Sequence, residues 1–156
     1  IDNSPAAIEA CRRRGVIDAR EVPLEHVSNS LGIFTTVLMY YGGFGLFGTR
    51  PKTQRVLRRL HQMTTPDAVI IAECVDPHVT DGPEDLRYIE RNRKRRRMPG
   101  QMTIRTRYRA YSTPWEEWLN VSPSEVEDVV EGTGWHVWHR IVDNPSEFVV
   151  FLAKTQ

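Results

Sequence analysis

Three stretches of the sequence have the apolar spacing of an amphipathic helix. The first follows Ser4-Pro5, an N-cap residue with proline at the first helical position, and it is expected to end at Gly15. The last follows a capping box formed by Ser122 and Glu125. The middle stretch, which ends before Pro66, carries an apolar stripe at i, i+1, i+4 and i+7, formed by Val56, Leu57, Leu60 and Met63.

Other stretches are apolar and β-branched without helical spacing, which is typical of buried strands. The two longest are residues 34–41 (FTTVLMYY) and residues 68–75 (AVIIAECV), and residues 16–22 are a weaker candidate. Near the C-terminus, residues 135–142 and 147–153 are predicted to be antiparallel neighbours, because only the short turn at 143–145 separates them. The order of elements predicts an α/β domain with a mostly parallel sheet, covered on both faces, and a C-terminal antiparallel hairpin.

Residues 76–114 interrupt this order, and we interpret them as an insertion in a single domain of residues 1–156. Within the insertion, residues 101–111 (QMTIRTRYRAY) alternate in polarity and predict one strand with a single wet face. The segment is also strongly basic. From Arg87 to Arg109 there are ten basic residues and one acid, so this stretch carries +9 and the remainder of the chain −8.

Composition narrows the class of protein. The chain has 156 residues, 40% of them hydrophobic, and a net charge of +1, which fits one globular domain and argues against a disordered or coiled-coil chain. No run reaches the roughly 18 apolar residues of a membrane helix. Two cysteines form no disulfide framework, and no secretory signal is seen, so we expect a cytoplasmic protein without a membrane partner.

Several of these segments, in this order, resemble class I S-adenosylmethionine-dependent methyltransferases. Residues 1–5 (IDNSP) with the small-residue helix after them resemble the end of that family's second strand. Residues 34–45 resemble its fourth strand and the following loop, although Thr35 stands where the family usually has Asp. The segment from Leu57 into AVIIAE resembles its fourth helix and fifth strand, and Thr133-Gly134-Trp135 with the terminal strands resembles the end of the domain. The resemblance implies a Rossmann-like three-layer fold and S-adenosylmethionine as cofactor.

The resemblance also implies a cofactor site at the carboxyl ends of the strands, where open α/β sheets bind ligands. An acid at Asp2 is placed to accept hydrogen bonds from the ribose hydroxyls, and Asn3 beside it is assigned to the same cofactor site; the alternative is that Asp2 or Asn3 caps the helix. Adenine is expected near Pro23 and Leu24, with Glu21 and Glu25 as nearby acids. The tyrosines of Tyr40-Tyr41-Gly42 face the sulfonium in this interpretation, since a cation over an aromatic ring gains about 0.5–2 kcal/mol, or else they are core residues.

Methyl transfer from a sulfonium requires alignment and exclusion of water more than a dedicated base. The catalytic residues are therefore unknown from the sequence, with His78 and Glu73 as candidate bases. His136 and His139 are three apart on a strand and should face opposite sides, so no metal site is expected. The resemblance places the acceptor under the insertion, and the candidate acceptor-binding residues are Phe44, His78, Arg107, Tyr108 and Trp115.

The leading hypothesis is methyl transfer to a small-molecule acceptor. The alternative is a non-catalytic nucleic-acid-binding module that uses the basic residues 87–109, although a solvated loop that balances acidic surface is also consistent with them. The family's Gly-rich cofactor loop has no counterpart in this sequence, because it would precede Ile1. We therefore expect the domain to lack its N-terminal strands, and a homodimer or a complementing N-terminal segment to fill the gap.

Overall fold

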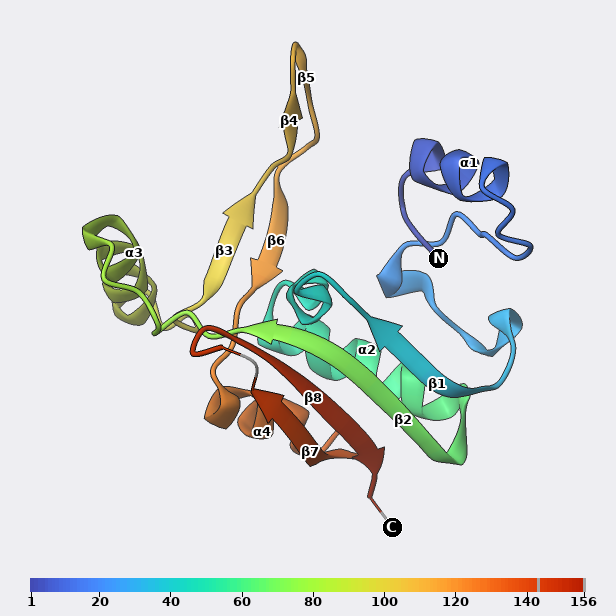
Figure 1. The fold of residues 1–156 in the computed structure, drawn as a ribbon. Helices are drawn as coiled ribbons and strands as arrows, with labels where there is room; N and C mark the ends of the chain where they lie inside the picture. The colour runs from blue at the N-terminus through green and yellow to red at the C-terminus, as the bar shows by residue number, and fades with distance from the viewer. Residues whose placement is uncertain (143, 156) are drawn as a thin grey trace.

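A four-stranded sheet forms the centre of the molecule (Figure 1). The structure is a computed structural model that describes residues 1–142 and 144–155. Strand order is β1-β2-β8-β7, with bounds Phe34–Met39, Thr64–Val75, Glu147–Lys154 and Trp135–Val142 in that order. Only β1 and β2 run parallel, whereas β2–β8 and β8–β7 are antiparallel. The expected mostly parallel sheet is therefore wrong for the described residues. Asp143, part of the predicted turn between β7 and β8, lies outside them.

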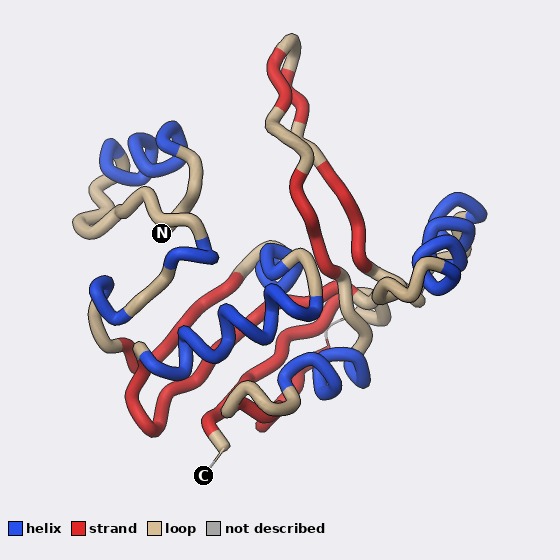
Figure 2. Tube along the Cα trace, turned by 180° about the vertical axis from the view of Figure 1, so that it is seen from behind, coloured by secondary structure: helices blue, strands red, loops and turns tan. Residues whose placement is uncertain are grey.

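Two helices pack on the same face of this sheet (Figure 2). They are α2, Arg50–Gln62, and α4, Pro123–Val130, which begins at the predicted capping box of Ser122 and Glu125. The predicted apolar stripe of α2 is fully buried and meets the side chains of β2 and β8 that point to this side. The core on this face includes Val56, Leu57, Leu60, Met63, Ala68, Ile70, Ala72, Val126, Val129, Val150 and Leu152.

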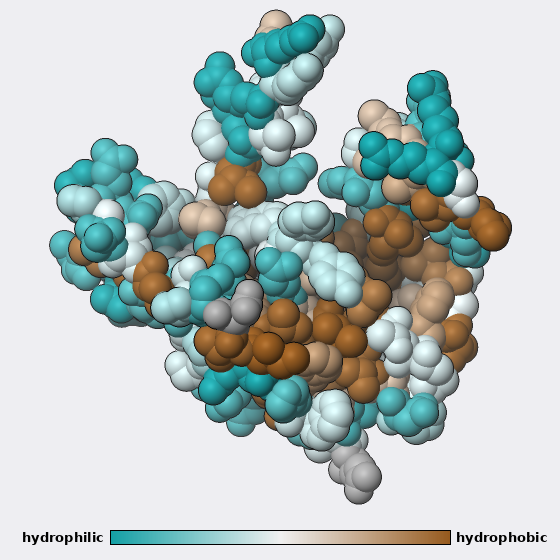
Figure 3. Space-filling model, in the orientation of Figure 1, coloured by the Kyte–Doolittle hydropathy of each residue, from teal (hydrophilic) through white to brown (hydrophobic). Residues whose placement is uncertain are grey.

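The opposite face of the sheet carries no helix in the described structure, contrary to the expected coverage of both faces. Neighbouring strands place a row of apolar residues on this face: Leu38 lies beside Ile71, and Ile71 lies beside Phe151. Leu38 is 53% exposed. Trp138 on β7, whose ring centroid lies 6.4 Å from that of Phe151, is 65% exposed. Figure 3 shows the resulting hydrophobic area on the side facing the viewer.

The same geometry corrects the expectation for residues 34–41. They form a strand as predicted, but β1 is at the edge of the sheet, and only Met39 in it is buried. Burial of an apolar strand requires neighbours on both faces and both edges, and β1 has β2 on one edge only.

The N-terminal segment forms a separate unit beside β1. Helix α1, Pro5–Arg13, begins at Ser4 as predicted, and the Ser4 side chain accepts a hydrogen bond from the amide of Ala7. Two short 3-10 turns follow, η1 at Leu24–His26 and η2 at Asn29–Leu31. The strand expected at residues 16–22 reduces to an isolated parallel bridge between Asp2 and Glu21. Ile17 is fully exposed there, so the apolar residues of this stretch gain no burial.

The insertion differs most from its prediction. It begins with a helix the sequence did not predict, α3 at Pro83–Lys94. The single strand expected at residues 101–111 is instead divided into two short strands, each of which pairs with a later strand so that a hairpin forms (Figure 1). Strand β3, Gln101–Ile104, pairs with β6, Glu116–Leu119, and beyond them β4, Arg107–Tyr108, pairs with β5, Tyr111–Ser112. This hairpin projects away from the body of the molecule.

Candidate functional site

A cavity of about 420 Å³ separates the N-terminal segment from β6 and the residue before it. It opens beside η3, Gly43–Phe47, the 3-10 helix that follows β1 at the carboxyl end of that strand. Three parts of the chain line it: the start of the chain and the segment around η1, the residues at η3 and α2, and β6 with the residue before it. The lining residues are Ile1, Asp2, Asn3, Val22, Leu24, Glu25, Leu46, Lys52, Trp115, Glu116, Glu117 and Trp118.

The bridge between Asp2 and Glu21 positions one wall of this cavity. The amide of Val22 donates to the carbonyl of Asp2 at 2.9 Å, and the amide of Asp2 donates to the carbonyl of Arg20 at 3.3 Å. These bonds bring the predicted ribose acid next to Leu24, the predicted adenine contact. The structure therefore unites two parts of the predicted cofactor site that are more than twenty residues apart in sequence.

Both interpretations of Asp2 are compatible with its geometry. Its Oδ1 accepts a hydrogen bond from the amide of Ser4 at 2.7 Å, so the side chain supports the start of α1. A carboxylate has two acceptor oxygens, and Asp2 is exposed on the cavity wall. The second oxygen is therefore available to a ligand while the first holds the turn.

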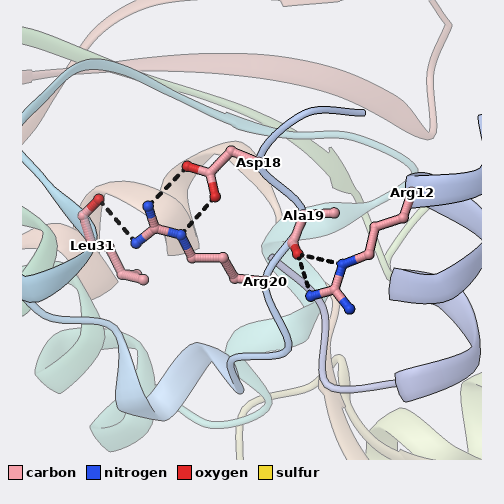
Figure 4. Close-up of polar contacts among 5 residues, drawn as sticks. All are labelled: Arg12, Asp18, Ala19, Arg20 and Leu31. Carbon is pink, nitrogen blue, oxygen red and sulfur yellow. Dashed lines mark hydrogen bonds and ion pairs between the residues drawn. The ribbon is translucent and has the colours of Figure 1, made fainter. Parts of the chain in front are cut away.

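Arginine side chains hold the loop behind this wall, as Figure 4 shows. The guanidinium of Arg12 donates to the carbonyl of Ala19 through two nitrogens, at 2.9 and 3.2 Å. Arg20 is paired with Asp18 and also reaches the carbonyl of Leu31 at 3.5 Å. The hydrogen bond from Arg20 lowers the pKa of Asp18. Arg12 thereby ties α1 to the loop that follows it.

Trp118 forms the roof of the cavity near η3. A Cβ at Gly45 would lie 2.1 Å from the Trp118 ring, so only glycine lets the indole pack this closely. The Trp118 Nε1 donates to Asn120 Oδ1 at 3.0 Å, which fixes the ring. Trp118 is not among the predicted acceptor residues, although it lies three positions after the predicted Trp115.

The charges around the cavity are mostly negative. Asp2, Glu25, Glu116 and Glu117 line it, and Lys52 is the one basic residue among the lining side chains. Lys52 forms an ion pair with Glu25, and the hydrogen bond from Lys52 lowers the pKa of that carboxyl. Three carboxylates therefore remain without a basic partner among the lining residues.

Tyr40, Tyr41 and Gly42, which are predicted cofactor residues, follow β1 directly. Tyr40 and Tyr41 are 65% and 93% exposed, so they are not core residues. Tyr41 and Gly42 both have a left-handed φ, and the amide of Tyr41 donates to the Glu73 carboxylate at 2.8 Å. Tyr40 lines a second cavity, of about 400 Å³, along the open edge of β1.

The structure contradicts the prediction that Phe44 contacts the acceptor. Phe44 is fully buried, and its ring centroid lies 5.0 Å from that of Phe47 in an edge-to-face arrangement. The η3 turn directs both rings into the core, so Phe44 has no exposed surface with which to contact an acceptor.

The other predicted acceptor residues do not come together. Trp115 lines the cavity, whereas Arg107 and Tyr108 are on the projecting hairpin and line none of the described cavities. His78 lies near the start of α4, with its Nε2 3.5 Å from an oxygen of Glu125. Of the predicted cofactor residues, Pro23 precedes η1 but is not part of the cavity lining.

Two histidines on β7 also differ from expectation. A bulge between Val137 and His139 shifts the register, so that His136 pairs with Ala153 and His139 with Phe151. Their partners are two residues apart, so both histidines face the same side. Across the described residues, no three metal-binding side chains gather into a candidate site. No helix in that part of the chain is long and apolar enough to span a membrane.

Comparison with solved structures decides the fold. A SAM-dependent methyltransferase from Bacteroides fragilis, solved with S-adenosyl-L-homocysteine, superimposes on 99% of this chain with a TM-score of 0.78 at 20% identity. The chain has the fold of the class I SAM-dependent methyltransferases. It spans 62% of the length of the B. fragilis protein. The sequence matches no protein-family model and no curated protein.

Two further structures support the methyltransferase fold. An S-adenosylmethionine-dependent methyltransferase from Clostridium acetobutylicum covers 99% of this chain, and the chain covers 74% of it, with a TM-score of 0.65 and 6% identity. The 1,6-didemethyltoxoflavin-N1-methyltransferase of Burkholderia thailandensis covers 100% of the chain, which covers 59% of it, with a TM-score of 0.58 and 14% identity.

Proposed function

We propose that this chain belongs to a SAM-dependent methyltransferase that transfers a methyl group to a small-molecule acceptor. The observation that carries the proposal is the placement of Asp2 beside Leu24 in a cavity next to η3, within the methyltransferase fold. The B. fragilis neighbour was solved with S-adenosyl-L-homocysteine, and the B. thailandensis neighbour with both S-adenosylhomocysteine and its small-molecule substrate. The two cysteines are free, which is consistent with a cytoplasmic setting.

The residues on the Asp2 side of the cavity fit the adenosine half of the cofactor. The free carboxylate oxygen of Asp2 accepts hydrogen bonds from ribose hydroxyls, while Leu24 and Val22 offer apolar surface to the adenine ring. When bound, the cofactor supplies a methyl group on a sulfonium with a built-in leaving group. Tyr40 lines the second cavity, which shares Leu24 and Leu46 with the first, and offers an aromatic face to that cation.

The opposite side of the cavity suits an acceptor without negative charge. Trp115 and Trp118 provide flat apolar walls, and Glu116 and Glu117 add two carboxylates next to them. Arg107, a predicted acceptor contact, lies on the hairpin instead. The work of the chain at this site is to orient the acceptor against these tryptophans and to exclude water.

The Asp2→Asn variant tests the cofactor site. Asparagine keeps an oxygen for the amide of Ser4 but removes the charge, so α1 should fold normally. Loss of hydrogen bonds to a charged acceptor costs about 1.5–3 kcal/mol, so we expect affinity for S-adenosylhomocysteine to fall about 10- to 100-fold. Isothermal titration calorimetry on the wild type and the variant measures this. Asp81→Asn, an exposed aspartate outside the cavity, is the matched control and should bind like the wild type. Equal affinity in all three proteins, or none in the wild type, contradicts the proposal.

The open sheet face supports a further part of the proposal, that two copies of the chain pack through it. Leu38, Ile71, Phe151 and Trp138 form a contiguous apolar surface, and such patches mark interfaces on soluble proteins. We expect the chain to be dimeric by light scattering, and the double substitution of Leu38→Lys and Trp138→Lys to shift it to monomer. A wild-type monomer would contradict the homodimer and leave the alternative, a complementing N-terminal segment in place of the missing strands.

A further inference from the structure

The projecting hairpin carries exposed arginine and aromatic side chains. Tyr108 pairs with Tyr111 across β4 and β5, and Arg107 pairs with Ser112, so the two tyrosines share one face and Arg107 lies on the other. Tyr108 and Tyr111 are 66% and 79% exposed. The guanidinium of Arg109, at the tip, lies 5.2 Å from the centre of the Tyr108 ring. At the base, Arg105 lies 4.6 Å from the centre of the Trp115 ring. We call residues 105–115 the arm.

A second group of basic residues lies before β3, at the other end of the β3–β6 pair. It runs from residue 91 in the last turn of α3 to residue 97, and we call it the basic turn. The loop is held in shape by Asn92, a buried side chain that donates to the carbonyls of Pro99 and Gln101 at 2.9 and 2.7 Å. Figure 3 shows both the arm and the α3 region as hydrophilic projections from the body.

The charge of these two groups is almost unopposed. From residue 91 to residue 115 there are nine basic residues and no acid. All nine are exposed, and within the described part of the chain only Lys94 makes an ion pair, with Glu90 at 3.6 Å. Like charges that are neighbours in sequence within each group repel one another, so each group favours an anionic partner. None of the nine lines the acidic cavity, so the cavity does not account for them.

We propose that the arm and the basic turn bind single-stranded nucleic acid. The arginines contact the phosphates, which lowers the repulsion among them. Tyr108 and Tyr111, side by side and exposed, offer flat surfaces on which unpaired bases stack, the combination typical of single-strand binding surfaces. This activity goes beyond methyl transfer and does not depend on it.

Two features favour this partner over a duplex or a lipid surface. Bases in a duplex are already stacked on one another, so exposed tyrosines gain contacts only from unpaired bases. An element that lies on a membrane inserts an apolar face, and the arm carries Arg107 and Ser112 on one face and tyrosines flanked by Arg109 on the other.

Fluorescence anisotropy of the full chain with a labelled 20-nucleotide oligouridylate tests the proposal. We expect binding that weakens steeply between 50 and 200 mM salt, and weaker binding to a 20-base-pair duplex. Replacing Arg105, Arg107 and Arg109 with Gln should lower affinity at least tenfold. It should also reduce the slope of log affinity against log salt by about 2, because each phosphate that is no longer neutralised lowers that slope by roughly 0.7.

Two further variants separate the causes. The Tyr108→Ala and Tyr111→Ala double variant leaves the charge unchanged and should lower affinity about tenfold or more, with an unchanged salt slope. The matched control replaces three other exposed arginines, Arg13, Arg14 and Arg55, with Gln and should bind within twofold of the wild type.

Four results would overturn the proposal. They are no binding by the wild type at 50 mM salt, equal losses in the arm and control variants, equal affinity for the duplex with no effect of the tyrosines, and binding to vesicles of 30% phosphatidylserine in phosphatidylcholine without binding to the oligonucleotide.

Discussion

Replacing Phe44 with alanine will lower the free energy of unfolding by about 3–5 kcal/mol, the usual cost of removing a buried phenylalanine. Phe44 has no exposed surface and packs edge-to-face on Phe47, within the core that also includes the buried residues of α2. Urea unfolding followed by tryptophan fluorescence measures the loss. The milder Phe44→Leu variant, which keeps most of the volume, should lose about 1–1.5 kcal/mol and remain folded for comparison.

Tyr41→Ala is the matched control for this prediction. It removes an aromatic ring three residues away that is 93% exposed, so stability should change by less than about 0.5 kcal/mol. The Phe44→Leu variant also decides whether Phe44 is a core residue or an acceptor contact. If Phe44→Leu unfolds like the wild type but loses affinity for the acceptor, then Phe44 contacts substrate and the packing argument is wrong.

The starts of two helices and the buried face of a third could be predicted from the sequence. Ser4, Pro5 and the capping box of Ser122 and Glu125 are at the starts of α1 and α4, since caps act through hydrogen bonds within a few residues. The apolar stripe of α2 also predicted the buried residues Val56 and Leu57. These features depend on near neighbours in the chain, so they can be predicted without knowing the tertiary structure.

What the sequence did not predict depends on distant contacts. The residues of β1 alone predict a buried strand, and only the strand order shows that β1 lies at the edge of the sheet. Helix α3 has just two buried residues, Ile89 and Asn92, so it lacks an apolar stripe. Residues 101–111 are interrupted after Ile104, and the hairpin turns at Arg109, whose left-handed φ of 54° is not marked by a glycine.

The candidate site shows the same division. Asp2 and Leu24 could be proposed because the order of strands and helices resembles a known family, and the structure brings them together. Glu116, Glu117 and Trp118 could not, since their approach to Asp2 depends on how the insertion folds back over η3. The sequence instead predicted Arg107 and Tyr108 as acceptor contacts, and the hairpin holds both outside the cavity.

Replacing Gly45 with alanine will destabilise the protein and disturb the roof of the cavity. The new methyl group would lie 2.1–2.6 Å from three atoms of the Trp118 ring, so the indole must move. Movement breaks its hydrogen bond to Asn120, and overpacking of this kind costs about 1–3 kcal/mol. A shift in the emission maximum of tryptophan fluorescence, together with urea unfolding, measures both effects.

A double-mutant cycle isolates the cause. Trp118→Leu alone removes the ring and part of the cavity wall, and in that background Gly45→Ala meets no indole. The second substitution should then cost less than about 0.5 kcal/mol, which gives a coupling of about 1–2 kcal/mol between the two positions. If Gly45→Ala costs the same with and without Trp118, the ring is not what requires glycine here. The close approach of Trp118 to η3 then does not shape the cavity. If the coupling is found, the fold of the insertion and the shape of the site are linked through this one contact, because Trp118 is on β6 and lines the cavity beside Leu46.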